Sequence, residues 1–374
     1  MSIVPPAAIG MLGGGQLGRY ALVAARLMGY RTLVVDPDPA APAGRIADEH
    51  LVASYDDEAA LDRLAAQCAV VTTEFENPPA GALRRLATST VVAPSAGAVA
   101  VAQDRVAEKA FLAEHGFAVA PYVLVGGPGD LDAAVARIDG PCLLKTARLG
   151  YDGKGQAVIA TPGELRTAWA ALGGVPCVLE RRVTLDHELS VLVARTADGR
   201  TATYPVAENH HVGGILDLTV VPARVDAAVA AEVKRLGVAI ADVLQFAGVL
   251  AVELFVSDGA VLVNELAPRP HNSGHWTLDA SMTSQFEQQV RAVCGLALGF
   301  TALTAPAAAM VNLLGDRWAG GEPDWSSVLA DPAARLHLYG KTTARPGRKM
   351  GHITVLAASA DEAAAQAVEL RQLL

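Results

Sequence analysis

The stretch AAIGMLGGGQLGRYALVAARLMGYRTLVVD, residues 7–36, decides the fold of the N-terminal part of the chain. An apolar run leads into Gly13, Gly15 and Gly18, which spell G-x-G-x-x-G, and a helical pattern follows. A β-branched run then closes on Asp36. This is the dinucleotide fingerprint of a βαβ unit, with glycines for a tight turn, a helix N-terminus for a pyrophosphate and an acid for a ribose. Taken alone, it predicts a parallel α/β domain and favours a nicotinamide oxidoreductase.

Composition describes a globular protein of two or three domains. The 374 residues are 52% hydrophobic and 18% charged, with a formal net charge of −9. This balance argues against nucleic acid or an anionic membrane as a partner. Residues 1–18 lack the basic start of a signal peptide, and glycines and a proline interrupt the uncharged stretch 292–315. Four scattered cysteines without a C-x-x-C pair are expected to be buried free thiols. We therefore expect a cytoplasmic protein.

Secondary-structure patterns divide the chain into three parts. Strand and helix patterns first alternate, as in a parallel sheet covered on both faces. Strands then come in hairpin-like pairs separated by helices, which is typical of an α+β domain with antiparallel sheet. The predicted pairs are 141–145 with 156–160, 176–183 with 187–196, and 249–256 with 260–266. The predicted domains are a Rossmann-like domain at 1–100, an α+β domain at 101–303 and a small β-rich C-terminal domain at 304–374.

A glycine-rich loop follows the apolar strand that ends at Lys145. Its sequence, RLGYDGKGQ at 148–156, combines three glycines with Lys154. Such a loop can close over phosphates with backbone N–H groups while the two lysines supply point charges. The Walker pattern is absent, so the loop is not a P-loop. An ordinary hairpin turn is the alternative.

Acidic residues lie on several predicted strands. Glu180 ends one strand and Glu188 lies in the next, where a solvated strand face is the preferred explanation and a ribose contact the alternative. Glu253 and Glu265 lie on two apolar strands joined by a short turn. Burying such carboxylates is costly unless a cation meets them, and Mg²⁺ takes one or two carboxylates with substrate phosphates. Two unrelated exposed glutamates are the alternative.

Strand register tests the metal interpretation. Side chains alternate between the faces of a strand, so two metal ligands on paired strands must share one face. A two-residue turn at Asp258–Gly259 would pair Glu253 with Asn264 and send Glu265 to the opposite face. A three-residue turn would place both glutamates on one face. A shared metal therefore requires an odd-numbered turn, or a bulge that restores the parity.

The loop RPHNSGHW, residues 269–276, is dense in hydrogen-bonding groups. No further His or Cys pair stands nearby to complete a zinc site, and no G-x-S-x-G nucleophile elbow is present. A substrate site is the preferred interpretation. Basic residues recur at 340–352 in this acidic chain, which predicts a site for an anion such as a substrate phosphate.

These residues resemble the N5-carboxyaminoimidazole ribonucleotide synthetases, ATP-grasp enzymes of bacterial purine biosynthesis. The matching motifs are GGGQLGR at 13–19, TTEFENPP at 72–79, GYDGKGQ at 150–156, ELSVLVAR at 188–195, NELAPRPHNSGHWT at 264–277, TSQFEQQVRAVCGL at 283–296 and KMGHITVL at 349–356. The resemblance implies a pre-ATP-grasp domain at 1–100 and an ATP-grasp domain at 101–303 that holds ATP between two sheets. It also implies that the first glycine loop binds the phosphate of the ribonucleotide, so that no nicotinamide is expected.

The resemblance assigns roles by position. ATP is expected against Arg105, Lys145, Gly150, Tyr151, Asp152, Gly153, Lys154, Gly155, Gln156, Glu180, Arg181, Arg182, Val183, Glu188, His211, Asn264 and Glu265. Mg²⁺, or Mn²⁺, is expected on Glu253 and Glu265. The ribonucleotide is expected against Gly15, Gln16, Leu17, Glu76, Tyr151, Asp152, Arg269, His271 and Asn272, with Lys341 and Arg348 on its phosphate. The catalytic residues are expected to be Lys145, Asp152, Arg269 and His271.

The implied reaction is the carboxylation of aminoimidazole ribonucleotide by ATP and bicarbonate through carboxyphosphate, in a homodimer. Either His271 or Asp152 would manage the proton, and closure of 146–155 would keep water from the unstable intermediate. The alternatives are another ATP-grasp ligase, such as a formate-dependent ribonucleotide transformylase, and a nucleotide-binding regulator with a dead site. Intact Lys145, Glu253 and Arg269 disfavour the regulator.

Overall fold

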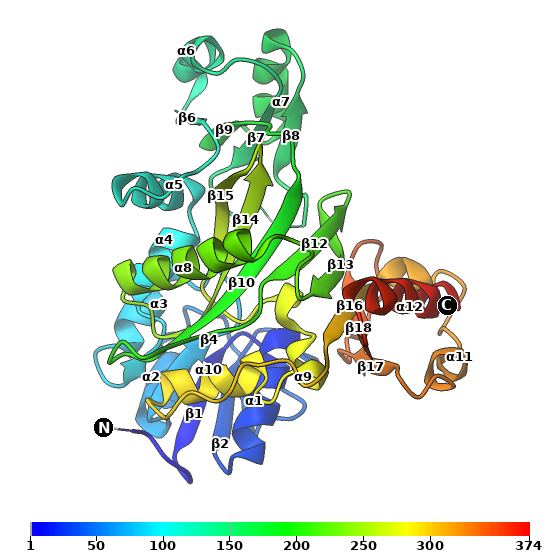
Figure 1. Ribbon diagram of the computed structural model, residues 1–374. Helices are drawn as coiled ribbons and strands as arrows, with labels where there is room; N and C mark the ends of the chain where they lie inside the picture. Colours follow the sequence, from blue (N-terminus) through cyan, green and yellow to red (C-terminus); the bar gives the residue numbers. More distant parts are fainter. Residues whose placement is uncertain (1, 151) are drawn as a thin grey trace.

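The computed structural model describes residues 2–150 and 152–374 and is built around three sheets (Figure 1). The N-terminal sheet is parallel, in the order β3-β2-β1-β4-β5. Its strands are β1 (Ala8–Leu12), β2 (Arg31–Val35), β3 (Glu49–Leu51), β4 (Val70–Thr73) and β5 (Val91–Val92), and its helices are α1 (Gln16–Leu27), α2 (Glu58–Gln67) and α3 (Ala80–Leu86). All of β1 is buried, and separate apolar clusters cover the two faces of the sheet. The predicted parallel α/β domain is confirmed.

A four-stranded antiparallel sheet forms the upper lobe in Figure 1. Its strands are β6 (Tyr122–Val125), β7 (Cys142–Thr146), β8 (Gln156–Ile159) and β9 (Cys177–Arg181), in the order β6-β9-β7-β8. The helices α6 (Leu131–Arg137) and α7 (Leu165–Ala171) contribute apolar residues to its single core cluster. The lobe therefore offers one face to the rest of the molecule.

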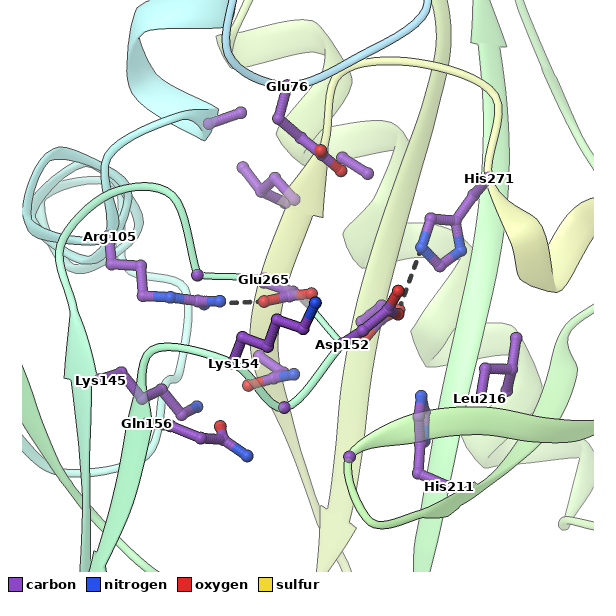
Figure 2. A pocket seen from close by; sticks show the side chains of 18 of the residues that line it. Glu76, Arg105, Lys145, Asp152, Lys154, Gln156, His211, Leu216, Glu265 and His271 are labelled. Carbon is purple, nitrogen blue, oxygen red and sulfur yellow. Dashed lines mark hydrogen bonds and ion pairs between the residues drawn. The ribbon is translucent and has the colours of Figure 1, made fainter. Parts of the chain in front are cut away.

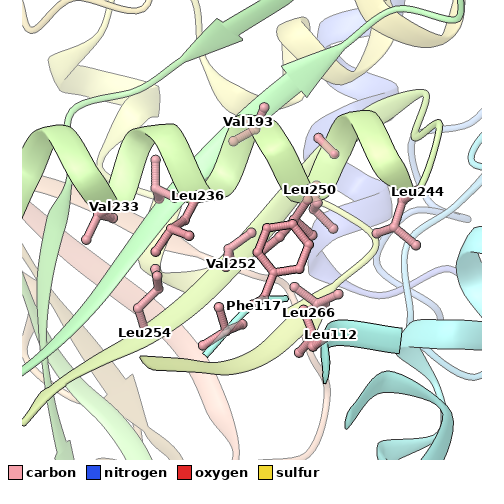
Figure 3. Close-up of a cluster of buried hydrophobic side chains, with 14 of the residues drawn as sticks. Leu112, Phe117, Val193, Val233, Leu236, Leu244, Leu250, Val252, Leu254 and Leu266 are labelled. Carbon is pink, nitrogen blue, oxygen red and sulfur yellow. The ribbon is translucent and has the colours of Figure 1, made fainter. Parts of the chain in front are cut away.

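A nine-stranded sheet forms the centre of the molecule. Its strands are β10 (His187–Arg195), β11 (Thr201–Thr203), β12 (Ala207–Val212), β13 (Ile215–Val221), β14 (Gly248–Ser257), β15 (Ala260–Ala267), β16 (Ala307–Leu314), β17 (Arg335–Leu338) and β18 (Lys349–Ala357). The helices around it are α8 (Ala227–Val243), α9 (Thr277–Ala280), α10 (Gln285–Val293), α11 (Trp325–Leu329) and α12 (Ala360–Gln372). Leucines and valines of α8, β10 and β14 form the largest core cluster (Figure 3). This packed layer gives the site a rigid floor.

Two helices join the N-terminal domain to the lobes. They are α4 (Ala96–Ala102) and α5 (Arg105–Glu114). The Asp104 carboxylate begins α5 by accepting from the amides of Val106 and Ala107, as an N-cap residue does. Since α5 contacts both β9 and β15, it lies where the two antiparallel sheets meet.

The structure corrects one of the predicted pairings and adds another. β9 and β10 do not form a hairpin, because β9 belongs to the four-stranded sheet and β10 to the central one. The hairpin that follows is β12–β13, which the sequence reading missed. The strands β16–β18 of the predicted C-terminal domain extend the central sheet, since β13 pairs with β16.

The four cysteines are free and buried, as predicted. Burial raises the pKa of Cys68 to about 12 and that of Cys177 to about 11. These thiols are therefore protonated and unreactive at neutral pH. Among the described residues, no helix is both long and apolar enough to cross a membrane.

Candidate active site

A cavity of about 570 Å³ lies between the two antiparallel sheets and reaches the N-terminal domain (Figure 2). The predicted site residues that line it are Gln16, Leu17, Glu76, Arg105, Lys145, Gly150, Asp152, Gly153, Lys154, Gln156, Arg182, Glu188, His211, Glu253, Asn264, Glu265, Arg269, His271 and Asn272. The predicted residues outside this described lining are Gly15, Gly155, Glu180, Arg181, Val183, Lys341 and Arg348. Tyr151 lies outside the described residues.

A buried ion cluster forms the wall that the four-stranded sheet gives to the cavity. The Nζ of Lys145 lies 2.7 Å from the Glu180 carboxylate, and the Nζ of Lys109 lies 3.4 Å from it. Burial alone would raise the pKa of Glu180, but the two ammonium groups lower it overall. The preferred interpretation of Glu180 as part of a solvated strand face is wrong, because its side chain is 3% exposed. The cluster holds the Lys145 ammonium at the cavity wall. Sequence reasoning missed Lys109.

Glu188 and His211 face each other across the neighbouring strands β10 and β12. The Nδ1 of His211 lies 2.6 Å from the Glu188 carboxylate. Burial would lower the pKa of His211, but its hydrogen bond to Glu188 and the charge of Glu253 raise it overall. Glu188 lines the cavity together with His211, whereas Glu180, which is engaged by lysines, lies outside its described lining.

The glycine loop between β7 and β8 lies directly against the turn of the β12–β13 hairpin. A Cβ atom added to Gly153 would come within 2.8 Å of the Gly213 carbonyl oxygen, and one added to Gly214 within 2.7 Å of the Gly153 Cα. Both positions also have positive φ angles, 75° and 81°. The backbones approach this closely only because neither residue carries a side chain. The loop therefore lies against the β12–β13 turn through glycine–glycine contact and lines the cavity.

The paired glutamates lie on one face of the β14–β15 hairpin, as the metal interpretation requires. The turn has two residues, Asp258 and Gly259, and pairs Ser257 with Ala260. A bulge beyond Leu254 then brings Glu253 opposite Glu265. The predicted alternative of a three-residue turn is wrong. The other predicted alternative is confirmed, because the bulge returns Glu265 to the face of the hairpin that Glu253 occupies.

The charges around this pair favour a divalent cation. Arg105 lies 2.7 Å from Glu265 and lowers the pKa of that carboxyl despite its burial. Burial and the charge of Glu265 raise the pKa of Glu253. Asn264 adds a buried Oδ1 atom without a hydrogen-bond partner. Glu253, Glu265 and Asn264 thus supply three oxygen donors, and within the described part of the chain the charge of the Glu253 carboxylate is not neutralised by an ion pair with an arginine or lysine. Such oxygen ligands match the preferences of Mg²⁺, so the residues present fit this ion.

His271 is positioned as a neutral imidazole beside the paired glutamates. Its Nε2 lies 3.3 Å from Glu253, while its Nδ1 lies 2.9 Å from the Ser273 hydroxyl. Ser273 in turn lies 2.8 Å from the hydroxyl of Ser190. Burial and neighbouring cations hold the pKa of His271 well below its usual range. The imidazole is therefore uncharged at neutral pH, and because Nδ1 accepts from the Ser273 amide, Nε2 carries the hydrogen.

Residues from three distant segments complete the other end of the cavity. Arg269 forms an ion pair with Glu76, and burial lowers the pKa of Arg269 to about 10. The side-chain amides of Asn272 and Asn312 bond to each other at 2.6 and 3.0 Å. These contacts link the N-terminal domain, the 269–276 loop and β16.

The basic residues near the C-terminus lie next to this end of the cavity. Lys349 lines it and forms an ion pair with Asp152 at 2.7 Å. The Nζ of Lys341 donates to the Lys349 carbonyl, and the Arg348 guanidinium donates to the Thr343 carbonyl. Sequence reasoning missed Lys349, although strand alternation allows only one of the adjacent residues 348 and 349 to face the cavity.

The first glycine-rich turn is filled from inside the protein. The amides of Gly15 and Gly18 donate to the Glu74 carboxylate at 2.7 and 2.9 Å. The amide of Gly14 donates to Asp36 at 2.7 Å. These three amides are already bonded, so the prediction that the turn binds a phosphate is wrong for them. Asp36, expected on a ribose in a dinucleotide site, is buried in the same network.

Comparison with known proteins agrees with this geometry. Three family models match: a ribonucleotide synthetase preATP-grasp domain at 7–103, an ATP-grasp domain at 110–286 and a phosphoribosylaminoimidazole carboxylase C-terminal domain at 308–366. The N5-carboxyaminoimidazole ribonucleotide synthase of Bacillus subtilis is 45% identical over 96% of this chain and 94% of its own length.

Solved structures give the same result. An ADP complex of an N5-carboxyaminoimidazole ribonucleotide synthetase is 40% identical with a TM-score of 0.93, covering 100% of this chain and 98% of its own. The Aspergillus clavatus enzyme in complex with ADP and aminoimidazole ribonucleotide is 30% identical with a TM-score of 0.87, covering 98% and 99%. This chain belongs to the N5-carboxyaminoimidazole ribonucleotide synthases, a family of ATP-grasp ligases.

Proposed function

We propose that this protein carboxylates 5-aminoimidazole ribonucleotide to N5-carboxyaminoimidazole ribonucleotide, using ATP and bicarbonate. One observation carries the proposal. A single cavity joins the Lys145 wall and the paired glutamates to the 269–272 loop and to residues of the N-terminal domain. A nucleoside triphosphate and a second phosphorylated substrate can therefore meet within one shared cavity.

The ATP half of the cavity supplies positive charge and cover. We assign the triphosphate to the side of Lys145 and the glycine loop, with Glu188 on the ribose. Glu253 and Glu265 would hold Mg²⁺, or Mn²⁺, which neutralises phosphate charge when bound. Phosphoryl transfer from ATP to bicarbonate requires positioning and charge neutralisation rather than covalent help from the protein.

The second half-reaction needs a proton acceptor. The exocyclic amine of the ribonucleotide attacks the carbonyl carbon of carboxyphosphate, phosphate leaves with the electron pair of the broken C–O bond, and the amine gives up one proton. We assign that proton to the phosphate that leaves, while His271, whose Nδ1 accepts from the Ser273 amide, directs its Nε2–H toward Glu253. Asp152 is the weaker candidate, since Lys349 already neutralises its carboxylate. The closed glycine loop excludes water from carboxyphosphate.

We further infer a three-domain division at 1–100, 101–303 and 304–374, and a cytoplasmic homodimer. The buried protonated thiols support a reducing compartment. Met282 and Phe300 are 69% and 75% exposed on segments joined by the bond from the Thr283 amide to the Phe300 carbonyl. A second copy would cover this apolar pair, and analytical ultracentrifugation tests the dimer.

Release of ADP with ATP and bicarbonate, measured with and without aminoimidazole ribonucleotide, tests the activity. We expect release to depend on both bicarbonate and the ribonucleotide, and the carboxylated product to form in equal amount. Turnover that requires formate in place of bicarbonate would identify a transformylase. Nucleotide binding without any turnover would identify a regulator.

A further inference from the structure

Glu74 occupies the position that a bound phosphate takes in a dinucleotide-binding domain. It directly follows β4 and lies at the N-terminus of α1, a helix of 12 residues. Its carboxylate accepts from the amides of Gly15 and Gly18. Amides at such a helix start point outward and carry partial positive charge, which is why they bind phosphate groups in other proteins.

The glycines of the turn form a cradle for this side chain. A Cβ atom at Gly13 would come within 2.6 Å of the Glu74 Cγ, and one at Gly15 within 2.5 Å of its Oε1. A Cβ atom at Gly18 would meet the Gly13 carbonyl oxygen at 2.8 Å. The G-x-G-x-x-G pattern is thus required here to admit the protein's own carboxylate, rather than a pyrophosphate.

Glu74 also connects two parts of the cavity wall. The turn that it holds continues into Gln16 and Leu17, which line the cavity. Two residues further along its own segment, Glu76 lines the cavity and forms an ion pair with Arg269. One carboxylate therefore fixes the turn relative to the segment that carries Glu76.

We propose that Glu74 is a positioning residue that fills the phosphate-binding position at the start of α1, here called the phosphate seat. By filling it, Glu74 fixes the part of the cavity wall against which the ribonucleotide binds. The part that concerns the ribonucleotide rests on the proposed function; the occupied seat does not. In this arrangement the N-terminal domain retains the dinucleotide fold but has no room for a dinucleotide phosphate.

Chemical rescue tests the occupied seat. Glu74→Ala is expected to lower the melting temperature, and sodium acetate is expected to restore it saturably, because acetate can reoccupy the enclosed amides. Sodium chloride at equal ionic strength controls for screening. Asp57→Ala is the matched variant: Asp57 caps α2 at the Ala60 amide, but at an exposed position without a cradle. Acetate is expected to leave this variant unchanged.

Kinetics test the positioning role. Glu74→Ala and the milder Glu74→Gln, which retains the size of the side chain, are expected to raise the KM for the ribonucleotide about tenfold or more, a loss of roughly 1.4 kcal/mol. The KM for ATP is expected to change less than about twofold, and acetate is expected to lower the ribonucleotide KM of Glu74→Ala. A purely structural role would lower the melting temperature without this split.

The outcomes separate the two claims. Equal rescue of Asp57→Ala, or no rescue of Glu74→Ala, overturns the occupied seat. An unchanged ribonucleotide KM in Glu74→Gln overturns the positioning role. A wild-type protein that does not turn over the ribonucleotide refutes the proposed function, while the acetate experiment still decides whether the seat is filled.

Discussion

The contact between the glycine loop and the β12–β13 turn makes a quantitative prediction about catalysis. Gly213 and Gly214 are adjacent and both have positive φ angles, 60° and 81°. A Cβ atom at Gly213 meets nothing within 4 Å, whereas one at Gly214 lies 2.7 Å from the Gly153 Cα. Gly213→Ala and Gly214→Ala therefore share the left-handed strain of about 1–2 kcal/mol but differ in the clash with the loop.

The magnitude follows from that distance. Ordinary carbon contacts begin near 3.4 Å, so the Gly214→Ala variant must move the loop by about 0.7 Å or more. Displacements near 1 Å in a reacting geometry cost up to about 100-fold in rate. We expect kcat/KM for ATP to fall about 10- to 100-fold in Gly214→Ala and less than about threefold in Gly213→Ala.

Coupling between the two half-reactions is the more specific assay. A displaced loop admits water to carboxyphosphate, so Gly214→Ala is expected to release more ADP than carboxylated product. Parallel measurement of ADP and product gives this ratio directly, with Gly213→Ala as the control. Equal ratios and equal kcat/KM in the two variants would refute the argument that the glycine contact holds the loop closed.

Three further predictions concern ligands. Mg-ATP is expected to raise the melting temperature, whereas NAD(H) and NADP(H) are expected to leave it unchanged at micromolar concentrations; tight nicotinamide binding would contradict the filled glycine turn. Burial and neighbouring cations lower the pKa of Lys341 to about 8, so its ammonium is lost above that pH. The ribonucleotide KM is then expected to rise with pH through this range, and Lys341→Arg to abolish the rise; an identical profile in the variant would remove Lys341 from the phosphate site. Glu253→Gln is expected to raise the Mg²⁺ concentration needed for half-maximal ADP formation at least about tenfold. An unchanged Mg²⁺ titration would exclude Glu253 as a ligand.

The sequence predicted elements whose signals are local. The glycines at 13–18 and the alternation of strand and helix patterns were sufficient for the N-terminal parallel sheet. The β12–β13 hairpin was missed because its first strand reads AENHHV, with no apolar alternation to mark it. The Gly-Gly pair in its turn was the local signal available in the sequence, since both glycines adopt positive φ angles as such turns require.

Contacts between distant residues explain the errors at the site. Glu74 lies 56 residues from Gly18, so no local pattern shows that the glycine turn is already occupied. Glu180 reads as an ordinary strand residue until Lys109 and Lys145 are placed beside it by two other elements. The family motifs located these segments correctly, but the charges that meet each carboxylate follow only from the tertiary arrangement.

The bulge in β15 makes contacts that strand register alone does not predict. Asn264 is the extra residue between Val263, which pairs with Leu254, and Glu265, which pairs with Glu253. A bulged residue has no partner in the ladder, and an unpaired buried carbonyl is costly. The Nζ of Lys109 satisfies the Asn264 carbonyl at 2.9 Å. The same buried lysine approaches Glu180 at 3.4 Å, so one cation stabilises both the bulge and the ion cluster around Lys145.

Deleting Asn264 tests whether the site needs the bulge itself or only two glutamates on one face. Without the extra residue, the two-residue turn would pair Glu253 directly with Glu265 in a regular ladder, so both glutamates would keep one face while the bulge and the Lys109 contact to its carbonyl would be lost. Asn264→Ala retains the bulge and removes only its side-chain oxygen. We expect both variants to retain Mg²⁺-dependent ADP formation but to need more Mg²⁺ for it, because both lose the Asn264 Oδ1 and keep the two glutamates on one face; far-ultraviolet circular dichroism shows whether both variants are folded. A folded deletion variant that no longer forms ADP in response to Mg²⁺ would show that a shared face is not sufficient, and the register argument for the metal would fail.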